Sequence, residues 1–232
     1  YMGIYKPLIN GTRTLEEFEQ IDHSNDKPVT PGDVMTYSRP PLASIAAWML
    51  LTGRRPASIV AGIAMATDME GQVCRWIDKT WPNSGYGSTE HGARRDPIAD
   101  TMAMGILGGA ILGAPKVSAS GKIATATVFG VEGYKTQWAL RSNAKFKNFT
   151  GEPLILPVSA DGKEAMAEKM TAIEFAIATN DVDNPVLKAA LGAGALAFAG
   201  VGSYRGERAR RAYEPLIEDL IAHHLENIPQ AA

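Results

Sequence analysis

The sequence has almost no cysteine, because Cys74 is the single one among 232 residues. An intrachain disulfide is therefore excluded, and so is a small disulfide-stapled scaffold. Charge of either sign is not in excess, since 23 Lys and Arg residues stand against 25 Asp and Glu residues. Such a balance gives no basic footprint for DNA or RNA, and we expect no nucleic-acid partner.

The sequence also lacks an uncharged apolar run of 18 residues, which would mark a membrane-spanning helix by itself. The longest such runs are 189–204, with sixteen residues, and 101–115, with fifteen. The mean hydropathy of −0.09 is low for a membrane protein. These features are typical of a soluble helical bundle with a surface acid cluster, and that interpretation stays open at this point.

What the chain has instead is a series of shorter apolar segments that are rich in Ala and Gly. In lipid, small residues let helix backbones approach closely. Charged residues at helix ends can lie in a polar cavity or reach the interface. We therefore predict an all-α fold, an integral membrane bundle of six transmembrane helices. Their expected positions are 34–52, 57–76, 97–114, 118–139, 164–180 and 187–205.

Basic residues are distributed unevenly about these six predicted helices. With the N-terminus inside, fourteen Lys and Arg residues gather on one side and five on the other. The five are Arg54, Arg55, Lys116, Lys122 and Lys188. This asymmetry is the one that the positive-inside rule describes. We therefore expect a multi-pass protein of the cell (inner or plasma) membrane with cytoplasmic termini, and we expect Arg205–Arg211 to face anionic lipid.

The chain divides into three regions. Residues 1–30 are polar, with a short helical-looking stretch, and we expect no signal peptide there. Residues 31–205 hold the six predicted helices and form the membrane domain. Residues 206–232 comprise an amphipathic helix at 206–226 and a tail. We interpret that helix as a surface element or as a contact of a homodimer.

One stretch of the chain carries acidic residues in a pattern that suits divalent cations. Asp96 and Asp100 are four residues apart, so on a helix their carboxylates lie on one face. Gly92, four residues earlier, leaves that face open, and Asp68 and Glu70 end another apolar segment. Paired acids on two helices can hold hard cations through oxygen ligands, and two such ions can clamp a diphosphate. The simpler alternative is a solvated helix face.

The same stretch resembles the signature of the CDP-alcohol phosphatidyltransferase family. That signature reads Asp-x-x-Asp-Gly-x-x-Ala-Arg and later Gly-x-x-x-Asp-x-x-x-Asp. Gly92, Asp96 and Asp100 match the second half at every named position, and Glu70–Arg75 matches the first half from its second acid onward. Thr36–Arg39 is similar to the Thr-x-x-Arg at the family's first membrane helix. Within the family, the similarity is greatest to phosphatidylglycerophosphate and phosphatidylinositol phosphate synthases.

The chain departs from this signature in three places. The first Asp of the signature falls on Thr67, and Asp68 comes one residue later, so the source of the first metal ligand stays open. Glu70 stands where the family has Asp. Residues 76–91 form a longer spacer than the family's eight or nine residues. These departures keep open a degenerate, non-catalytic family member that binds nucleotide or lipid in the membrane.

The resemblance implies that the phosphatidyl group of CDP-diacylglycerol is transferred to an alcohol, with release of CMP. Asp100 would be the general base. Two Mg²⁺ or Mn²⁺ ions would be held by Thr67 or Asp68, Glu70, Asp96 and Asp100. The substrate would be bound by Thr36, Arg39, Gly71, Arg75, Thr89 and Gly92. The alternative for the two arginines is that they extend to the membrane interface.

The acceptor alcohol is indicated by basic residues. Lys135 and Arg141 are expected to gather with Lys163 near the inner ends of the fourth and fifth predicted helices. Because charge-assisted contacts to phosphate are strong, such a site suits a phosphorylated polyol. We therefore expect glycerol 3-phosphate or inositol phosphate as the acceptor.

Overall fold

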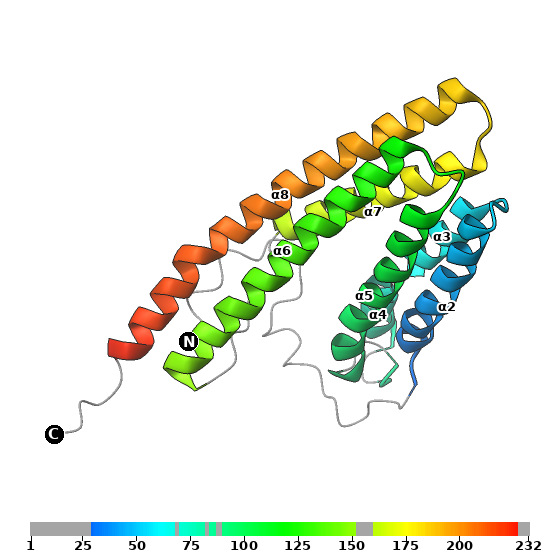
Figure 1. Ribbon diagram of the computed structural model, residues 1–232. Coiled ribbons are helices and arrows are strands. Elements are labelled where there is room, and N and C mark those ends of the chain that lie inside the picture. Colours follow the sequence, from blue (N-terminus) through cyan, green and yellow to red (C-terminus); the bar gives the residue numbers. More distant parts are fainter. Residues whose placement is uncertain (1–28, 68–69, 82–83, 87–89, 152–159, 227–232) are drawn as a thin grey trace. The chain divides into compact units, whose positions relative to one another are not determined.

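The computed structural model describes residues 29–67, 70–81, 84–86, 90–151 and 160–226, and all regular elements in these ranges are helices (Figure 1). They are α2 (Pro31–Leu51), α3 (Ala57–Ala66), α4 (Glu70–Thr80), α5 (Glu90–Gly113), α6 (Ala119–Thr150), α7 (Ala160–Asp181) and α8 (Pro185–Glu226). The prediction of an all-α fold is confirmed. The predicted polar segment 1–30 lies almost wholly outside the described residues.

The predicted helix over 57–76 is wrong as a single helix. α3 ends at Ala66, and α4 begins at Glu70. The Thr67 hydroxyl donates a hydrogen bond to the carbonyl oxygen of Ala64 at 2.6 Å. It thereby satisfies one of the carbonyl groups that a helix end leaves without a backbone partner. Each of the other five predicted spans lies within one helix, to within one residue.

α8 continues without interruption across the predicted boundary between 205 and 206, so the sixth predicted span and the predicted amphipathic helix over 206–226 are parts of one helix, Pro185–Glu226. Side-chain pairs one turn apart support the helix beyond this boundary. Arg210 forms ion pairs with Glu207 at 2.7 Å and with Glu214 at 2.5 Å, and Arg211 pairs with Glu207 at 2.9 Å. Such pairs at spacings of three and four residues stabilise a helix.

The chain forms two compact units, and the three long helices contribute to both. We call the first the N-terminal unit; among the described residues it contains α2 to α5 with residues 119–126, 170–181 and 185–196. We call the second the C-terminal unit; it contains the described residues among 127–169 and 197–232.

Helix ends meet at one end of the N-terminal unit. The Asp181 carboxylate, at the end of α7, accepts hydrogen bonds from the backbone N–H groups of Ala57 at 3.1 Å and Ser58 at 2.8 Å. A carboxylate at a helix N-terminus satisfies free donors and complements the helix dipole. α7 therefore caps α3, and the end of one helix lies beside the start of the other.

The connections between the helices lie at this same end. Asn180 donates to the carbonyl oxygen of Arg54 at 3.1 Å, and Lys116 donates to that of Gly53 at 2.9 Å. Arg55 forms an ion pair with Asp183, and this contact lowers the pKa of the Asp183 carboxyl. The α2–α3, α5–α6 and α7–α8 connections are thus held together, as Figure 1 shows. The two helices that each of these connections joins therefore run in opposite directions.

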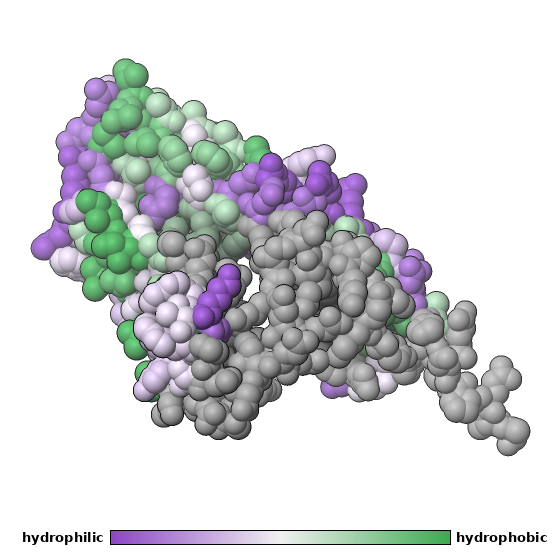
Figure 2. All heavy atoms as spheres, turned by 180° about the vertical axis from the view of Figure 1, so that it is seen from behind, coloured by the Kyte–Doolittle hydropathy of each residue, from purple (hydrophilic) through white to green (hydrophobic). Residues whose placement is uncertain are grey.

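Small side chains form much of the buried core, while many large apolar side chains are exposed. Alanines are buried on α2, α3, α5 and α7, whereas Ile59, Ile98 and Met102 are more than half exposed. On the face drawn in Figure 2, apolar residues form a continuous area at the top of the view. In water, burial would favour the largest apolar side chains. Large apolar side chains are therefore left at the surface on several helices, where a protein partner or lipid can cover them.

One helix among the described residues, Pro185–Ala222, is long and apolar enough to cross a membrane. Two shorter apolar helical stretches, Ala57–Ala66 and Ile98–Gly113, fall below that length. The structure therefore carries an indication of membrane association, mainly in α8.

Candidate functional site

Three of the predicted site residues meet in the N-terminal unit. Arg39 on α2 donates a hydrogen bond from Nε to the hydroxyl oxygen of Thr67, just after α3, at 3.0 Å. The same guanidinium forms an ion pair through Nη1 with Asp100 on α5. Three helices that are distant in sequence thus bring the three side chains together; we call them the Arg39 cluster. Thr36, one turn before Arg39 on α2, is buried as well.

Burial decides between the two interpretations of Arg39. Its side chain is only 3% exposed, whereas the Asp100 side chain is 28% exposed. An arginine that extends to the membrane interface would leave its head group in water. A buried guanidinium needs a carboxylate and further hydrogen bonds to offset its desolvation. The interface interpretation is therefore wrong for Arg39, whose charge is held inside the helix bundle.

The other predicted site residues are placed by the backbone. Asp96 and Gly92 lie on α5, four and eight residues before Asp100 on the same continuous helix. α4 carries Glu70 as its first residue and then Gly71 and Arg75. The predicted site residues outside the described part of the chain are Asp68 and Thr89. Among the described residues, no three Asp, Glu, His or Cys side chains group closely enough to hold a metal ion.

The contact of Thr67 with Arg39 allows a test of which residue, Thr67 or Asp68, supplies the first metal ligand. Because the Thr67 hydroxyl faces the Arg39 cluster, we expect Thr67→Asp to place a carboxylate in that cluster. We expect Mn²⁺ binding to tighten on the order of tenfold, since a charged oxygen replaces a neutral hydroxyl. Electron paramagnetic resonance of free Mn²⁺ measures this. Weaker binding in Thr67→Asp, together with complete loss of binding in Asp68→Ala, would instead assign the ligand to Asp68.

Lys135 lies in the C-terminal unit, in a cluster that the sequence alone did not reveal. Its ammonium donates to Glu132 Oε1 at 3.1 Å, and Lys169 on α7 pairs with the same oxygen. Lys169 is 1% exposed. A Cβ added to Gly206 would lie 2.8 Å from Lys169 Nζ and 3.3 Å from Lys135 Nζ. Two ammonium groups thus share one carboxylate beside the bare backbone of α8, while Arg141 is exposed on α6.

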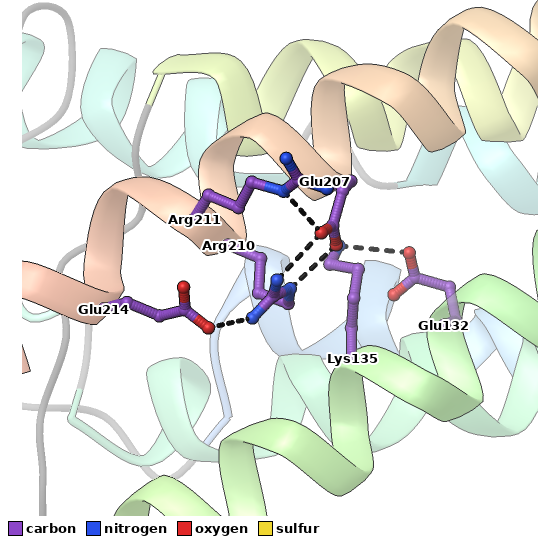
Figure 3. Close-up of polar contacts among 6 residues, drawn as sticks. All are labelled: Glu132, Lys135, Glu207, Arg210, Arg211 and Glu214. Atoms are coloured by element: carbon purple, nitrogen blue, oxygen red, sulfur yellow. Dashed lines mark hydrogen bonds and ion pairs between the residues drawn. The ribbon is translucent and has the colours of Figure 1, made fainter.

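The arginines at 205–211 do not form the free basic surface that the sequence suggested. Arg205 pairs with Glu164 and Glu168, and Arg208 pairs with Asp161 at 2.7 Å. Figure 3 shows the remaining pairs, which join Arg210 and Arg211 to Glu207 and Arg210 to Glu214.

The pairs of Arg205 and Arg208 join α8 to α7, whereas those of Arg210 and Arg211 lie within α8. Hydrogen bonds from Arg210 and Arg211 lower the pKa of Glu207 to about 2. The Arg210 guanidinium also lies 5.6 Å from the ring centre of Tyr134 and 5.4 Å from that of Trp138, both on α6. Such cation–π contacts add to the ion pairs. These arginines are thus paired with acids of the protein itself, and their contact with anionic lipid stays a prediction.

Comparison with known proteins found no match to a family model, to a curated protein or to a solved structure.

Proposed function

We propose that the protein is a membrane-embedded CDP-alcohol phosphatidyltransferase. It would transfer the phosphatidyl group of CDP-diacylglycerol to an alcohol and release CMP. The observation that supports this most is the Arg39 cluster: Arg39, Thr67 and Asp100 lie in contact although 28 residues separate the first two. The signature resemblance assigns these three residues to one substrate and metal site. A surface acid cluster has no need of a buried arginine partner from another helix.

The donor atoms suit a hard divalent cation. The Asp100 carboxylate and the Thr67 hydroxyl offer oxygens within one cluster, and Asp96 and Glu70 add acids on α5 and α4. Mg²⁺ and Mn²⁺ prefer such oxygen ligands. When bound, these ions supply charge stabilisation for a diphosphate. Two ions held by Thr67 or Asp68, Glu70, Asp96 and Asp100 are what we propose.

The residues of the chain would act on the proton and on the substrate. The acceptor hydroxyl attacks the β-phosphorus of CDP-diacylglycerol, so that one P–O bond forms and the bond to CMP breaks. Asp100 takes the proton of that hydroxyl as general base. Before the metal ions bind, Arg39 would hold the Asp100 carboxylate in place through the ion pair and a fixed guanidinium plane. Gly71 and Gly92 would leave room for the nucleotide beside α4 and α5.

The Lys135 cluster supports an anionic acceptor. Lys135 and Lys169 together carry two positive charges against one carboxylate, that of Glu132. Excess positive charge at a buried group is costly unless an anion balances it. A phosphate group on the acceptor would supply that anion. We therefore propose a phosphorylated polyol, such as glycerol 3-phosphate or inositol phosphate, as the acceptor.

Six crossings of the cell membrane would place the reaction at its cytoplasmic side. Exposed large apolar residues on several helices and the alternating helix directions in the N-terminal unit support this arrangement. In a Cys74→Ala background, we expect Arg55→Cys and Lys145→Cys to react with an impermeant maleimide from opposite sides. Right-side-out and inverted vesicles provide the measurement. Labelling of both positions from the same side would contradict the six-helix topology.

The reaction itself is tested with purified protein in detergent and radiolabelled CDP-diacylglycerol. We expect CMP release to require both Mn²⁺ and an acceptor, and to be fastest with a phosphorylated polyol. Binding of CDP-diacylglycerol without CMP release would favour the degenerate family member, which Thr67 in place of Asp motivates. Recovery of the protein in the soluble fraction without detergent would instead support a soluble bundle.

A further inference from the structure

A cation that belongs to the protein already neutralises the carboxylate that the proposed reaction needs. The Arg39 guanidinium is paired with Asp100 and is almost completely buried. Thr67 holds its Nε atom at 3.0 Å. The guanidinium is thus fixed from two sides, by Thr67 just after α3 and by Asp100 on α5, and it is not a mobile surface charge.

A divalent cation would have to compete with this guanidinium for the Asp100 carboxylate. The guanidinium and the divalent cation would both interact with the lone pairs of the Asp100 carboxylate. Two cations held a few ångströms apart in a partly buried site also repel each other strongly. Thr67 contacts Nε through an uncharged hydroxyl, whereas the ion pair with Asp100 forms through Nη1. The geometry therefore sets Arg39 and a metal ion in competition.

We propose that Arg39 is a built-in counter-ion that exchanges with a divalent cation at Asp100. Without the metal ion, the ion pair neutralises Asp100 and ties α2 to α5. When the metal ion binds, the Arg39–Asp100 pair opens. This inference rests on the proposed function, because it takes Asp100 as a metal ligand. It assigns Arg39 to the control of metal binding, a role separate from substrate binding.

The first test measures Mn²⁺ alone on the full chain in detergent, by electron paramagnetic resonance. We expect Arg39→Gln to bind Mn²⁺ on the order of tenfold more tightly than the wild type, because a competing charge is removed. Arg39→Lys keeps the charge and is expected to bind as the wild type does. Arg54→Gln removes an exposed arginine outside the predicted site residues and serves as the matched control, with unchanged binding expected.

The second test is a double-mutant cycle on thermal unfolding with Arg39→Gln, Asp100→Asn and the combined variant. We expect the two single changes to be strongly coupled in EDTA and uncoupled in saturating Mn²⁺, because reciprocal linkage requires metal binding to weaken the ion pair. If Arg39→Gln does not fold, Arg39→Met, which fills the same buried space, takes its place in both tests.

The outcomes separate this inference from the proposed function. Equal or weaker Mn²⁺ binding by Arg39→Gln, in a protein whose wild type releases CMP, overturns the exchange and leaves the function intact. Coupling between Arg39 and Asp100 that persists in saturating Mn²⁺ does the same. If neither the wild type nor the Arg39 variants bind Mn²⁺, both the exchange and the metal-dependent function are wrong.

Discussion

The Asp96→Asn variant is expected to release CMP at least about a hundredfold more slowly than the wild type while it keeps its fold. Asp96 lies one turn before Asp100 on α5, on the helix face that we propose for the metal ions. Asn keeps an oxygen donor and the side-chain volume but removes the negative charge. Loss of one preorganised electrostatic contact of this kind typically costs about 10²–10³ in rate. Single-turnover CMP release at saturating CDP-diacylglycerol measures the effect.

A matched control removes an acid of the same type elsewhere. Asp219 is exposed on α8, so Asp219→Asn makes the same chemical change on a solvated helix face. We expect its CMP release and its unfolding midpoint to equal those of the wild type. Near-normal turnover by Asp96→Asn would show that the acids of α5 have a structural role only.

The helices could be predicted from the sequence where the apolar pattern is continuous. α2, α5, α6, α7 and α8 each contain a predicted span, because an apolar stretch with small residues has few alternatives to a helix. The break after Ala66 was missed. At this break the Thr67 hydroxyl bonds the carbonyl of Ala64 and is itself held by Arg39. A helix end that is fixed by a tertiary contact leaves no local signal.

The candidate site, too, could be predicted from the sequence only in part. Asp96 and Asp100 could be placed on one face from their spacing alone, since a helix repeats every 3.6 residues. The pairing of Arg39 with Asp100 could not be predicted, because it joins α2 to α5 across 61 positions of sequence. For the Lys135 cluster, the i, i+3 spacing of Glu132 and Lys135 was a usable signal. Lys169 gave none, because a lysine in a helix is usually solvated.

The arrangement of apolar residues bears on the choice between a membrane protein and a soluble bundle. Alanines and a few larger residues such as Leu50 and Ile111 fill the core, whereas Trp48 and Ile45 lie half exposed on the same helix as Leu50. A mean over the whole sequence cannot detect this, since it does not distinguish inward from outward residues. The low mean hydropathy is therefore compatible with helices that present their apolar side chains to lipid.

A second large effect is expected in the C-terminal unit, from the Glu132→Gln variant. Glu132 is the carboxylate that Lys135 and Lys169 share, and Lys169 is 1% exposed. Without the negative charge, a buried ammonium faces a second ammonium, and both lie against Gly206. Removing one partner of a buried ion pair typically costs about 3–5 kcal/mol. Because Glu132 itself is 37% exposed, we expect a loss near the lower end of that range.

Circular dichroism of the purified protein in detergent follows the unfolding, and we expect its midpoint to fall by about 6–12 °C. Glu218→Gln, which neutralises an exposed acid on α8, is the matched control and should leave the midpoint unchanged. The decisive variant is Glu132→Gln with Lys169→Met, which removes both charges and keeps an unbranched side chain in the buried space. We expect it to regain most of the lost stability, since replacing a buried ion pair by apolar groups is often neutral. A double variant as unstable as Glu132→Gln would show that the loss of stability comes from packing. The positive charge of Lys169 would then not be the cause, and the argument for an anionic acceptor at this cluster would fail.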